Sequence, residues 1–266
     1  MRNLLKTLIV AMAAIAGFLP VLHAQTAESA GAAKAQTAAA PDISGVYRQH
    51  PPADVRAYAL YSFTKEEPPM TPWADALFKA NKPSFGPRSA GDSNDPTNPT
   101  TGSSVGCVPP GVPRIYQHPF PMEILQVPGR VIILYEFDHY VRQIYTDGRA
   151  HDKNLAATWM GDSTGRWEGD TLVVDTVNFN DKTWLDRGGH PHSDQLHLTE
   201  RIHRVPPDIL QIDMTIEDPK AYTKTWTASQ FFQLRPKWNI MEMICEDNAN
   251  FLELQKEVLA PPSKKP

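Results

Sequence analysis

Cysteine and long apolar segments are scarce in this sequence. Only two of its 266 residues are cysteine, which excludes a small fold held together by a network of disulfides. After the first 24 residues, no stretch approaches the roughly 20 consecutive apolar residues that a membrane-spanning helix needs. The apolar fraction of 41% is nonetheless sufficient for a hydrophobic core. The sequence therefore predicts a soluble globular protein.

An excess of positive charge is also absent. The 26 lysines and arginines are outnumbered by 30 aspartates and glutamates, which gives a net charge of −4 at pH 7. Arg2 and Lys6 lie in the leader described next, and their removal brings the net charge to −6. Domains that bind nucleic acid usually carry a basic surface. We therefore expect no nucleic-acid partner.

Residues 1–24 have the features of a secretory signal peptide. Two basic residues precede an apolar run, and Ala24 lies at a junction with a polar segment. The run is too short for a membrane anchor, and Pro20 interrupts it. Residues 25–41 are mostly Ala, Thr, Gln and Ser, a composition typical of a flexible linker. We expect a periplasmic or secreted protein with no membrane attachment after cleavage.

Residues 42–252 are predicted to form a single β domain. Five runs rich in β-branched and aromatic residues are separated by turn residues; they cover residues 130–145, 171–179, 195–204, 209–216 and 226–234. Short connections favour antiparallel neighbours, and closure of the sheet would protect its edges. We therefore predict a mainly β fold, a single antiparallel β-barrel of about eight to ten strands.

The N-terminal part of this domain is less regular. Residues 71–81 predict one short helix, with Thr71 as its N-cap and Pro72 in the first helical position. Residues 81–113 are dense in Pro, Gly, Ser and Asn, which predicts a long irregular loop of the kind that can cover a pocket. Residues 253–266 form a short, Pro-rich polar tail.

The two cysteines, Cys107 and Cys245, both follow the leader. In an oxidising compartment, a lone pair of cysteines most simply forms a disulfide. A reactive thiol is the alternative, but no obvious base and orienting residue accompany either cysteine. We therefore predict a Cys107–Cys245 disulfide.

Histidines are concentrated in residues 183–204, which contain four of the nine in the chain. On an extended backbone, His190 and His192 would project to the same side. A carboxylate that accepts one imidazole N–H fixes the tautomer, so that the other nitrogen can move a proton near pH 7. We expect His192 to move the proton, with His190 as the alternative, and Asp186 or Asp194 to orient it.

The same histidines allow two other interpretations. A His-x-His pair can chelate a metal ion, but the following carboxylates do not have the spacing of a cupin site. The segment can also be a polar loop whose histidines face water. We expect no metal ion and no cofactor, and a His-liganded metal hydrolase remains the lesser alternative.

A second polar group falls within residues 130–145, taken as one strand. Glu136, Asp138 and Arg142 lie on one face of this strand, and His139 lies on the other. Arg142 either pairs with Glu136 or Asp138, or it lines the barrel mouth and binds a substrate oxygen. The residues expected to contact a small organic substrate are Trp184, Asn178, His139 and Glu200.

Five sequence blocks carry a family resemblance. They are CVPPGVPR (107–114), RQIYTDGR (142–149), GDSTGRWEGDTLVVDTVNFNDKTWLD (161–186), HPHSDQLHLTER (190–201) and IEDPKAYTKTW (216–226). In this order they resemble a large family of uncharacterised exported bacterial proteins. The resemblance covers about residues 42–248 and implies a lipocalin-like (calycin-type) barrel. Lys224-Thr225-Trp226 replaces the Lys-Pro-Trp expected in that family.

These observations lead to two main hypotheses. The first is a periplasmic enzyme that performs acid/base proton transfer, as a lyase, hydratase or isomerase, in a barrel cavity. In that enzyme Arg142 would stabilise an oxyanion and Trp184 would form a wall of the site. The second is a non-catalytic lipocalin-like protein that binds a hydrophobic or sugar-like ligand.

Overall fold

The computed structural model describes residues 40–97, 107–205 and 207–245. The predicted signal peptide (1–24) and the tail (253–266) lie outside the described residues, as does all of the predicted linker (25–41) except its last two residues. The same holds for the centre of the predicted long loop, at residues 98–106, and for residues 246–252 of the predicted domain.

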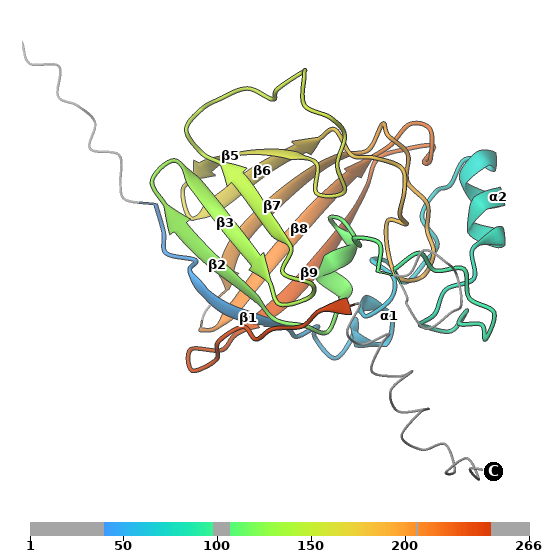
Figure 1. The fold of residues 1–266 in the computed structure, drawn as a ribbon, viewed down its shortest axis with the longest axis horizontal. Helices are drawn as coiled ribbons and strands as arrows, with labels where there is room; N and C mark the ends of the chain where they lie inside the picture. Colours follow the sequence, from blue (N-terminus) through green and yellow to red (C-terminus); the bar gives the residue numbers. More distant parts are fainter. Residues whose placement is uncertain (1–39, 98–106, 206, 246–266) are drawn as a thin grey trace, which may run out of the picture. The chain divides into compact units, whose positions relative to one another are not determined.

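Nine strands form one closed barrel in the described part of the chain (Figure 1). They are β1 (Gly45–Gln49), β2 (Met122–Val127), β3 (Arg130–Tyr135), β4 (Val141–Tyr145), β5 (Asp162–Glu168), β6 (Thr171–Val177), β7 (His197–Val205), β8 (Ile209–Glu217) and β9 (Trp226–Leu234). Each strand pairs with the next in sequence, and β9 pairs with β1. The prediction of a mainly β, single-barrel fold is confirmed.

One strand pair departs from the predicted antiparallel order. β4 and β5 run parallel and share only two residue pairs, Ile144 with Ser163 and Tyr145 with Thr164. Parallel neighbours require a connection that returns the chain to the end where it started. Residues 146–161 make this connection as a long excursion outside the strands (Figure 1). The expectation of a purely antiparallel barrel was therefore wrong at this seam.

The run at residues 130–145 is two strands and not one. A tight turn separates β3 from β4, and its central residues Asp138 and His139 have φ angles of 54° and 52°. Such left-handed conformations at two successive residues reverse the chain within a hairpin. The prediction that Glu136, Asp138 and Arg142 share one strand face was therefore wrong, because the first two lie in the turn.

The predicted helix is confirmed as α2 (Pro72–Ala80), where the Thr71 side chain accepts a hydrogen bond from the Ala74 amide at 3.3 Å. Two shorter helical segments were not predicted, α1 (Arg56–Ala59) and the 3₁₀ helix η2 (Arg114–Gln117). Among the described residues, no helix has the length and apolar character needed to cross a bilayer.

The predicted disulfide is present. Cys107 and Cys245 are bonded, with their Cα atoms 5.6 Å apart and a sequence separation of 138. The cross-link therefore connects the segment that precedes β2 to the segment that follows β9.

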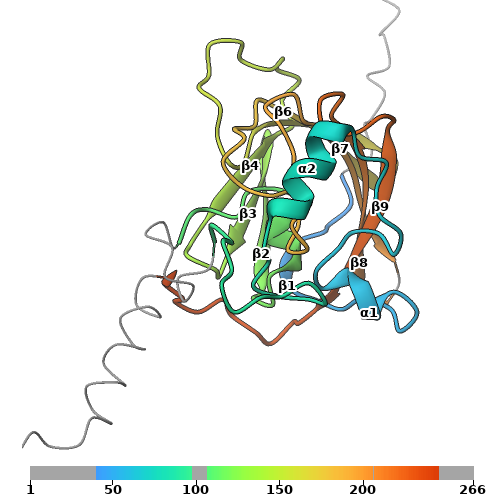
Figure 2. The ribbon, with the colours of Figure 1, turned by 90° about the vertical axis from the view of Figure 1, so that its right-hand side faces the viewer.

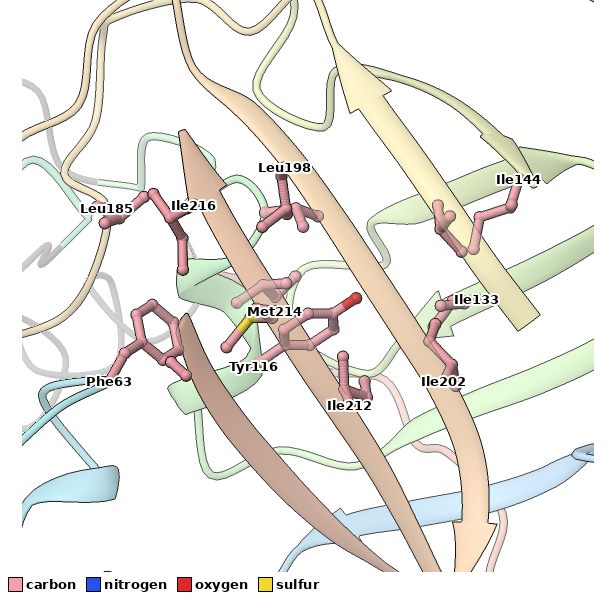
Figure 3. Close-up of a cluster of buried hydrophobic side chains, with 14 of the residues drawn as sticks. Phe63, Tyr116, Ile133, Ile144, Leu185, Leu198, Ile202, Ile212, Met214 and Ile216 are labelled. Atoms are coloured by element: carbon pink, nitrogen blue, oxygen red, sulfur yellow. The ribbon is translucent and has the colours of Figure 1, made fainter. Parts of the chain in front are cut away.

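The interior of the barrel is filled by side chains. Inward-facing residues alternate along the strands, most clearly on β8, and Tyr116 of η2 projects among them. The members of this buried cluster that are labelled in Figure 3 are Phe63, Tyr116, Ile133, Ile144, Leu185, Leu198, Ile202, Ile212, Met214 and Ile216. Full burial of a side chain of this kind stabilises the fold by about 1.5–3 kcal/mol.

Candidate functional site

Loops gather at one end of the barrel, which we call the loop end. It is formed by residues 50–97, 107–121, 178–196 and 218–225. Hydrogen bonds join these segments: the Thr71 amide donates to Ala221 O at 2.8 Å, and Asn81 Nδ2 donates to Gly189 O at 2.8 Å. Figure 2 shows α2 and the neighbouring loops in front of the strands. The polar residues singled out from the sequence fall mainly inside the barrel or at this end.

Arg142 lies inside the barrel, where it forms an ion pair with Glu200. Their exposed fractions are 1% and 0%. All five N–H groups of the guanidinium are used: Nη1 donates to Glu200 Oε1 at 3.1 Å and to the Tyr116 hydroxyl at 2.6 Å. Nη2 donates to Glu200 Oε2 and to the hydroxyl of Thr176, and Nε donates to the hydroxyl of Ser163.

The ion pair answers the question of which carboxylate, if any, pairs with Arg142. The partner of Arg142 is Glu200 of β7, and not Glu136 or Asp138 as expected. Burial alone would lower the pKa of Arg142, but Glu200 raises it above its usual value. Burial raises the pKa of Tyr116, so its hydroxyl keeps its proton. The guanidinium therefore stays charged, and all of its donors are used by the protein.

His190 lies at the loop end between two carboxylates. Its Nδ1 donates to Asp186 Oδ2 at 2.6 Å, and its Nε2 donates to Glu67 Oε2 at 2.6 Å. Asp186 also accepts the backbone N–H of His190 at 3.0 Å. The ring stacks on Phe78 of α2, with centroids 4.5 Å apart and an interplanar angle of 9°. The imidazole is thus fixed in both position and orientation.

The electrostatics of this group favour a protonated imidazole. Burial lowers the pKa of His190, but Asp186 and Glu67 outweigh it and raise the pKa to about 9. The hydrogen bond from His190 lowers the pKa of Glu67 below its usual value. At neutral pH an imidazolium therefore lies between two carboxylates. Asp186 is buried, whereas the Glu67 side chain is 62% exposed.

A cavity of about 240 Å³ opens beside His190, and we call it the His190 cavity. Its aromatic walls are Phe78, Phe85 and Tyr61. Its polar lining includes Glu67, Lys65 and Arg88. Arg88 is held by hydrogen bonds to the carbonyls of residues 78, 81 and 188. The cavity therefore combines apolar surface with a proton donor and two cations.

His192 occupies a different environment from His190. It is 6% exposed, its Nδ1 lies 3.1 Å from the carbonyl of Ser193, and its Nε2 lies 3.5 Å from the hydroxyl of Thr183. Burial lowers the pKa of His192 below its usual value, which favours a neutral ring. It is not among the residues that line the His190 cavity. The structure therefore separates the two histidines that the sequence placed together.

The remaining sequence candidates are dispersed. Asp194 and His139 are exposed, and His139 belongs to the β3–β4 turn. Trp184 is buried, with the guanidinium of Arg114 5.2 Å from its ring. Asn178 has a φ of 63° and donates to Leu155 O at 2.7 Å. Of the predicted site, the structure brings together Asp186 with His190 at the loop end, and Arg142 with Glu200 inside the barrel.

A third polar cluster crosses the outer face of β5 to β8. His151 bridges Asp162 at 3.0 Å and Asp175 at 2.9 Å. His197 bridges the other oxygen of Asp175 at 2.5 Å and Glu217 at 2.9 Å. Carboxylates and imidazoles alternate along this row, and neighbouring strands are linked through it.

The described residues contain no group of three or more His, Cys, Asp or Glu side chains arranged to hold a metal ion. Both ring nitrogens of His190 are engaged by carboxylates, so neither offers a lone pair to a metal. A His190–His192 chelate does not fit this geometry.

Sequence analysis missed Glu67, which lies 123 residues from His190. The segment around it, Lys65-Glu66-Glu67, has the composition of an ordinary exposed loop, so no local pattern could have indicated its role. Comparison with known proteins adds no assignment: no family model and no curated protein matches the chain. The site is therefore interpreted from its own geometry.

Proposed function

We propose that the protein is an enzyme that transfers a proton to or from a small organic substrate in the His190 cavity. Support comes from one arrangement above all: an imidazole fixed by a buried carboxylate, with its second nitrogen directed at the cavity lining. In this proposal His190 is the catalytic acid/base and Asp186 is its positioning residue. The reaction class is elimination, hydration or isomerisation.

The position of Glu67 suggests how the cycle begins. Its carboxylate accepts the Nε2 proton of His190, which is the place that a substrate oxygen or carbanion would take. A substrate that displaces this exposed side chain leaves His190 with Asp186 alone. Loss of one carboxylate brings the His190 pKa down toward neutrality, where an imidazole both donates and accepts protons effectively.

The lining of the cavity supports a particular class of substrate. Lys65 and Arg88 place positive charge beside the proton donor. Cations in such a position stabilise negative charge that develops on oxygen when a carbon–hydrogen bond is broken. Phe78, Phe85 and Tyr61 supply apolar contact. The substrate would be a small carbonyl compound or carboxylate with an apolar portion.

We further propose that the protein works in the periplasm or outside the cell, as a member of the exported family that its sequence blocks resemble. The disulfide between Cys107 and Cys245 supports an oxidising compartment. A lipocalin-like relationship would agree with the closed barrel.

A non-catalytic binding protein is the second candidate, and one observation favours it. The hydrogen bonds of His190 are complete without a ligand, which is also expected of a group that only shapes the cavity wall. This alternative predicts ligand binding without turnover.

Hydrogen–deuterium exchange at carbon tests the proposed chemistry across many candidate substrates at once. The purified protein is incubated in D₂O with a panel of small carbonyl compounds and carboxylates, and deuterium incorporation is followed by NMR. We expect exchange into at least one compound with the wild-type protein, and a loss of at least about 100-fold with His190→Gln.

The matched control is His50→Gln, since His50 is an exposed histidine that does not line the His190 cavity. This variant should exchange deuterium at the wild-type rate. Absence of exchange across the panel, or an equal rate in His190→Gln, would contradict the proposal.

A further inference from the structure

A second cavity lies at the loop end on the other side of Phe85. Its volume is about 240 Å³, and we call it the Arg187 cavity. It shares Phe85 with the His190 cavity, but its other lining residues differ. Phe120 and Phe137 provide apolar surface, and the charged residues are Arg187, Arg114 and Asp95. None of these charged residues was a sequence candidate.

The charges in this cavity do not balance. Arg114 is 1% exposed and pairs with Asp95, whose two oxygens accept from Arg114 Nη2 at 2.7 and 2.8 Å. Arg187 has no carboxylate within ion-pair distance in the described part of the chain. The lining therefore contains two guanidinium groups and one carboxylate, which leaves one uncompensated positive charge.

Arg187 is held in place by neutral groups. Its Nη1 donates to Gln117 O at 3.1 Å, and its guanidinium lies 3.9 Å from the ring centroid of Phe85. Burial, together with the nearby Arg114, lowers the pKa of Arg187 to about 10. The side chain is thus charged at neutral pH in a position where that charge is poorly solvated. Such a charge is costly unless an anion accompanies it.

Unsatisfied polar atoms also lie within the residues that line this cavity. Arg114 Nε and Nη1 and His118 Nε2 are buried and have no hydrogen-bond partner among the described residues. Both residues line the same cavity. Buried polar atoms normally have partners, so these three atoms add to the free-energy cost of the site. Burial also lowers the pKa of His118 well below its usual range, so the ring does not add a second uncompensated charge.

We propose that the Arg187 cavity binds a small organic monocarboxylate, with its carboxylate on Arg187 and its apolar part against Phe120 and Phe137. A planar guanidinium matches a carboxylate through two parallel hydrogen bonds. A single negative charge balances the lining, whereas a phosphate dianion would leave an excess. The volume is below that of drug-sized pockets and suits a ligand with one ring or a short branched chain.

One part of the cavity wall is cross-linked to the rest of the fold. Met243 and Cys245 form part of the lining, and Cys245 is tied to Cys107 by the disulfide. The Asp138 amide donates to Met243 O at 2.7 Å, and the Cys245 amide donates to Asp138 Oδ1 at 3.2 Å. A preformed cavity reduces the entropy that binding must overcome.

Calorimetric titration of the full-length protein tests this assignment. The probes are benzoate, phenylacetate and 3-methylbutanoate, with benzamide as the neutral counterpart of benzoate. We expect at least one carboxylate to bind, benzamide to bind at least about tenfold more weakly than benzoate, and Arg187→Met to weaken carboxylate binding by at least about tenfold. Arg187→Lys keeps the positive charge but lacks the planar guanidinium, so it should lose an intermediate amount of carboxylate affinity.

Two controls separate this site from others. Arg149→Gln removes an exposed arginine that pairs with Asp147, and it should bind like the wild type. A carboxylate that binds in the His190 cavity instead would lose affinity in His190→Gln and keep it in Arg187→Met, and that pattern would overturn the assignment to the Arg187 cavity. The proposal is overturned if no carboxylate binds at about 10 mM, or if Arg187→Met binds as tightly as the wild type. Should Arg187→Met not fold, Arg187→Lys decides, because an unchanged benzoate affinity in that variant overturns the proposal.

Discussion

Two buried arginines in this protein, Arg142 and Arg114, differ in how completely their N–H groups are hydrogen-bonded. Inside the barrel, Arg142 has an acidic partner, and all five of its N–H groups are hydrogen-bonded. At the loop end, Arg114 pairs with Asp95, but its Nε and Nη1 have no partner among the described residues, and the neighbouring Arg187 has no carboxylate within ion-pair distance there. Both Arg142 and Arg114 are 1% exposed, so burial alone does not distinguish them.

The difference separates a structural role from a binding role. A complete network holds strands of the barrel together and leaves no donor for a ligand. At the loop end, unpaired buried groups cost free energy, and the uncompensated charge of Arg187 can attract an anion. The barrel interior therefore supplies stability, while the loop end carries the groups that we assign to function.

Breaking the interior network should have the largest effect. Arg142→Leu leaves the Glu200 carboxylate buried without a counter-charge, and we expect a loss of about 3–5 kcal/mol in the free energy of unfolding. Chemical denaturation measures this loss. The double variant Arg142→Leu/Glu200→Leu removes both charges and should recover much of it. A loss below about 1 kcal/mol in the single variant would contradict a structural role for the pair.

Titration of His190 should have the next largest effect. Its pKa in the folded protein is about 9, above the usual 6.5, so its contribution is complete below pH 6.5 and is lost as the pH rises through 9. The expected loss is about 2–3 kcal/mol, the lower figure allowing for the exposure of Glu67. Denaturation curves between pH 6 and pH 10 measure it.

The His190→Gln variant provides the matched control for this titration. Its free energy of unfolding should be nearly flat over the same pH range, apart from changes common to both proteins. An unchanged pH dependence in the variant would show that another group is responsible.

Replacement of Arg187 should have a much smaller effect than replacement of Arg142. Arg187→Met removes a charge without a carboxylate partner, and it also removes the stacking on Phe85 and the hydrogen bond to Gln117. These opposing contributions should leave the free energy of unfolding within about 1 kcal/mol of the wild type. A loss as large as that in Arg142→Leu would mean that Arg187 has a structural role.

The smallest effect is expected at the surface. The Arg149 and Asp147 side chains are 51% and 38% exposed, and water screens their interaction. Arg149→Gln should therefore leave the unfolding midpoint unchanged in the same denaturation experiment. A clear shift of the midpoint would mean that this exposed ion pair contributes to the free energy of unfolding despite its contact with water.

The sequence predicts features that depend on neighbouring residues. Helix α2 follows from Thr71 and Pro72, and the tight connection at residues 169–170 follows from its Glu-Gly-Asp composition. The β3–β4 turn was missed because hydrophobic residues flank it on both sides. Asp and His adopt left-handed conformations more readily than most residues, and this tendency was the available indication.

Features that join distant segments could not be predicted in this way. Arg142 and Glu200 are 58 residues apart, and their meeting depends on how β4 and β7 face each other across the barrel. Glu67 reaches His190 from a loop in a distant part of the sequence, and Asp95 reaches Arg114 from an irregular segment. Residue types were sufficient to indicate Asp186 and His190, but only the fold supplies their partners.

The parallel seam has a consequence for the cooperativity of the barrel. β4 and β5 share two residue pairs, whereas β7 and β8 share nine. On the other side of the barrel, β1 shares three pairs with β2 and three with β9. The barrel therefore resembles two antiparallel arcs, β2–β4 and β5–β9, that are joined directly at the parallel seam and through the short strand β1. Amide protons of β7 and β8 should exchange with solvent only on global unfolding, while those beside the seam exchange through a local opening that separates the arcs.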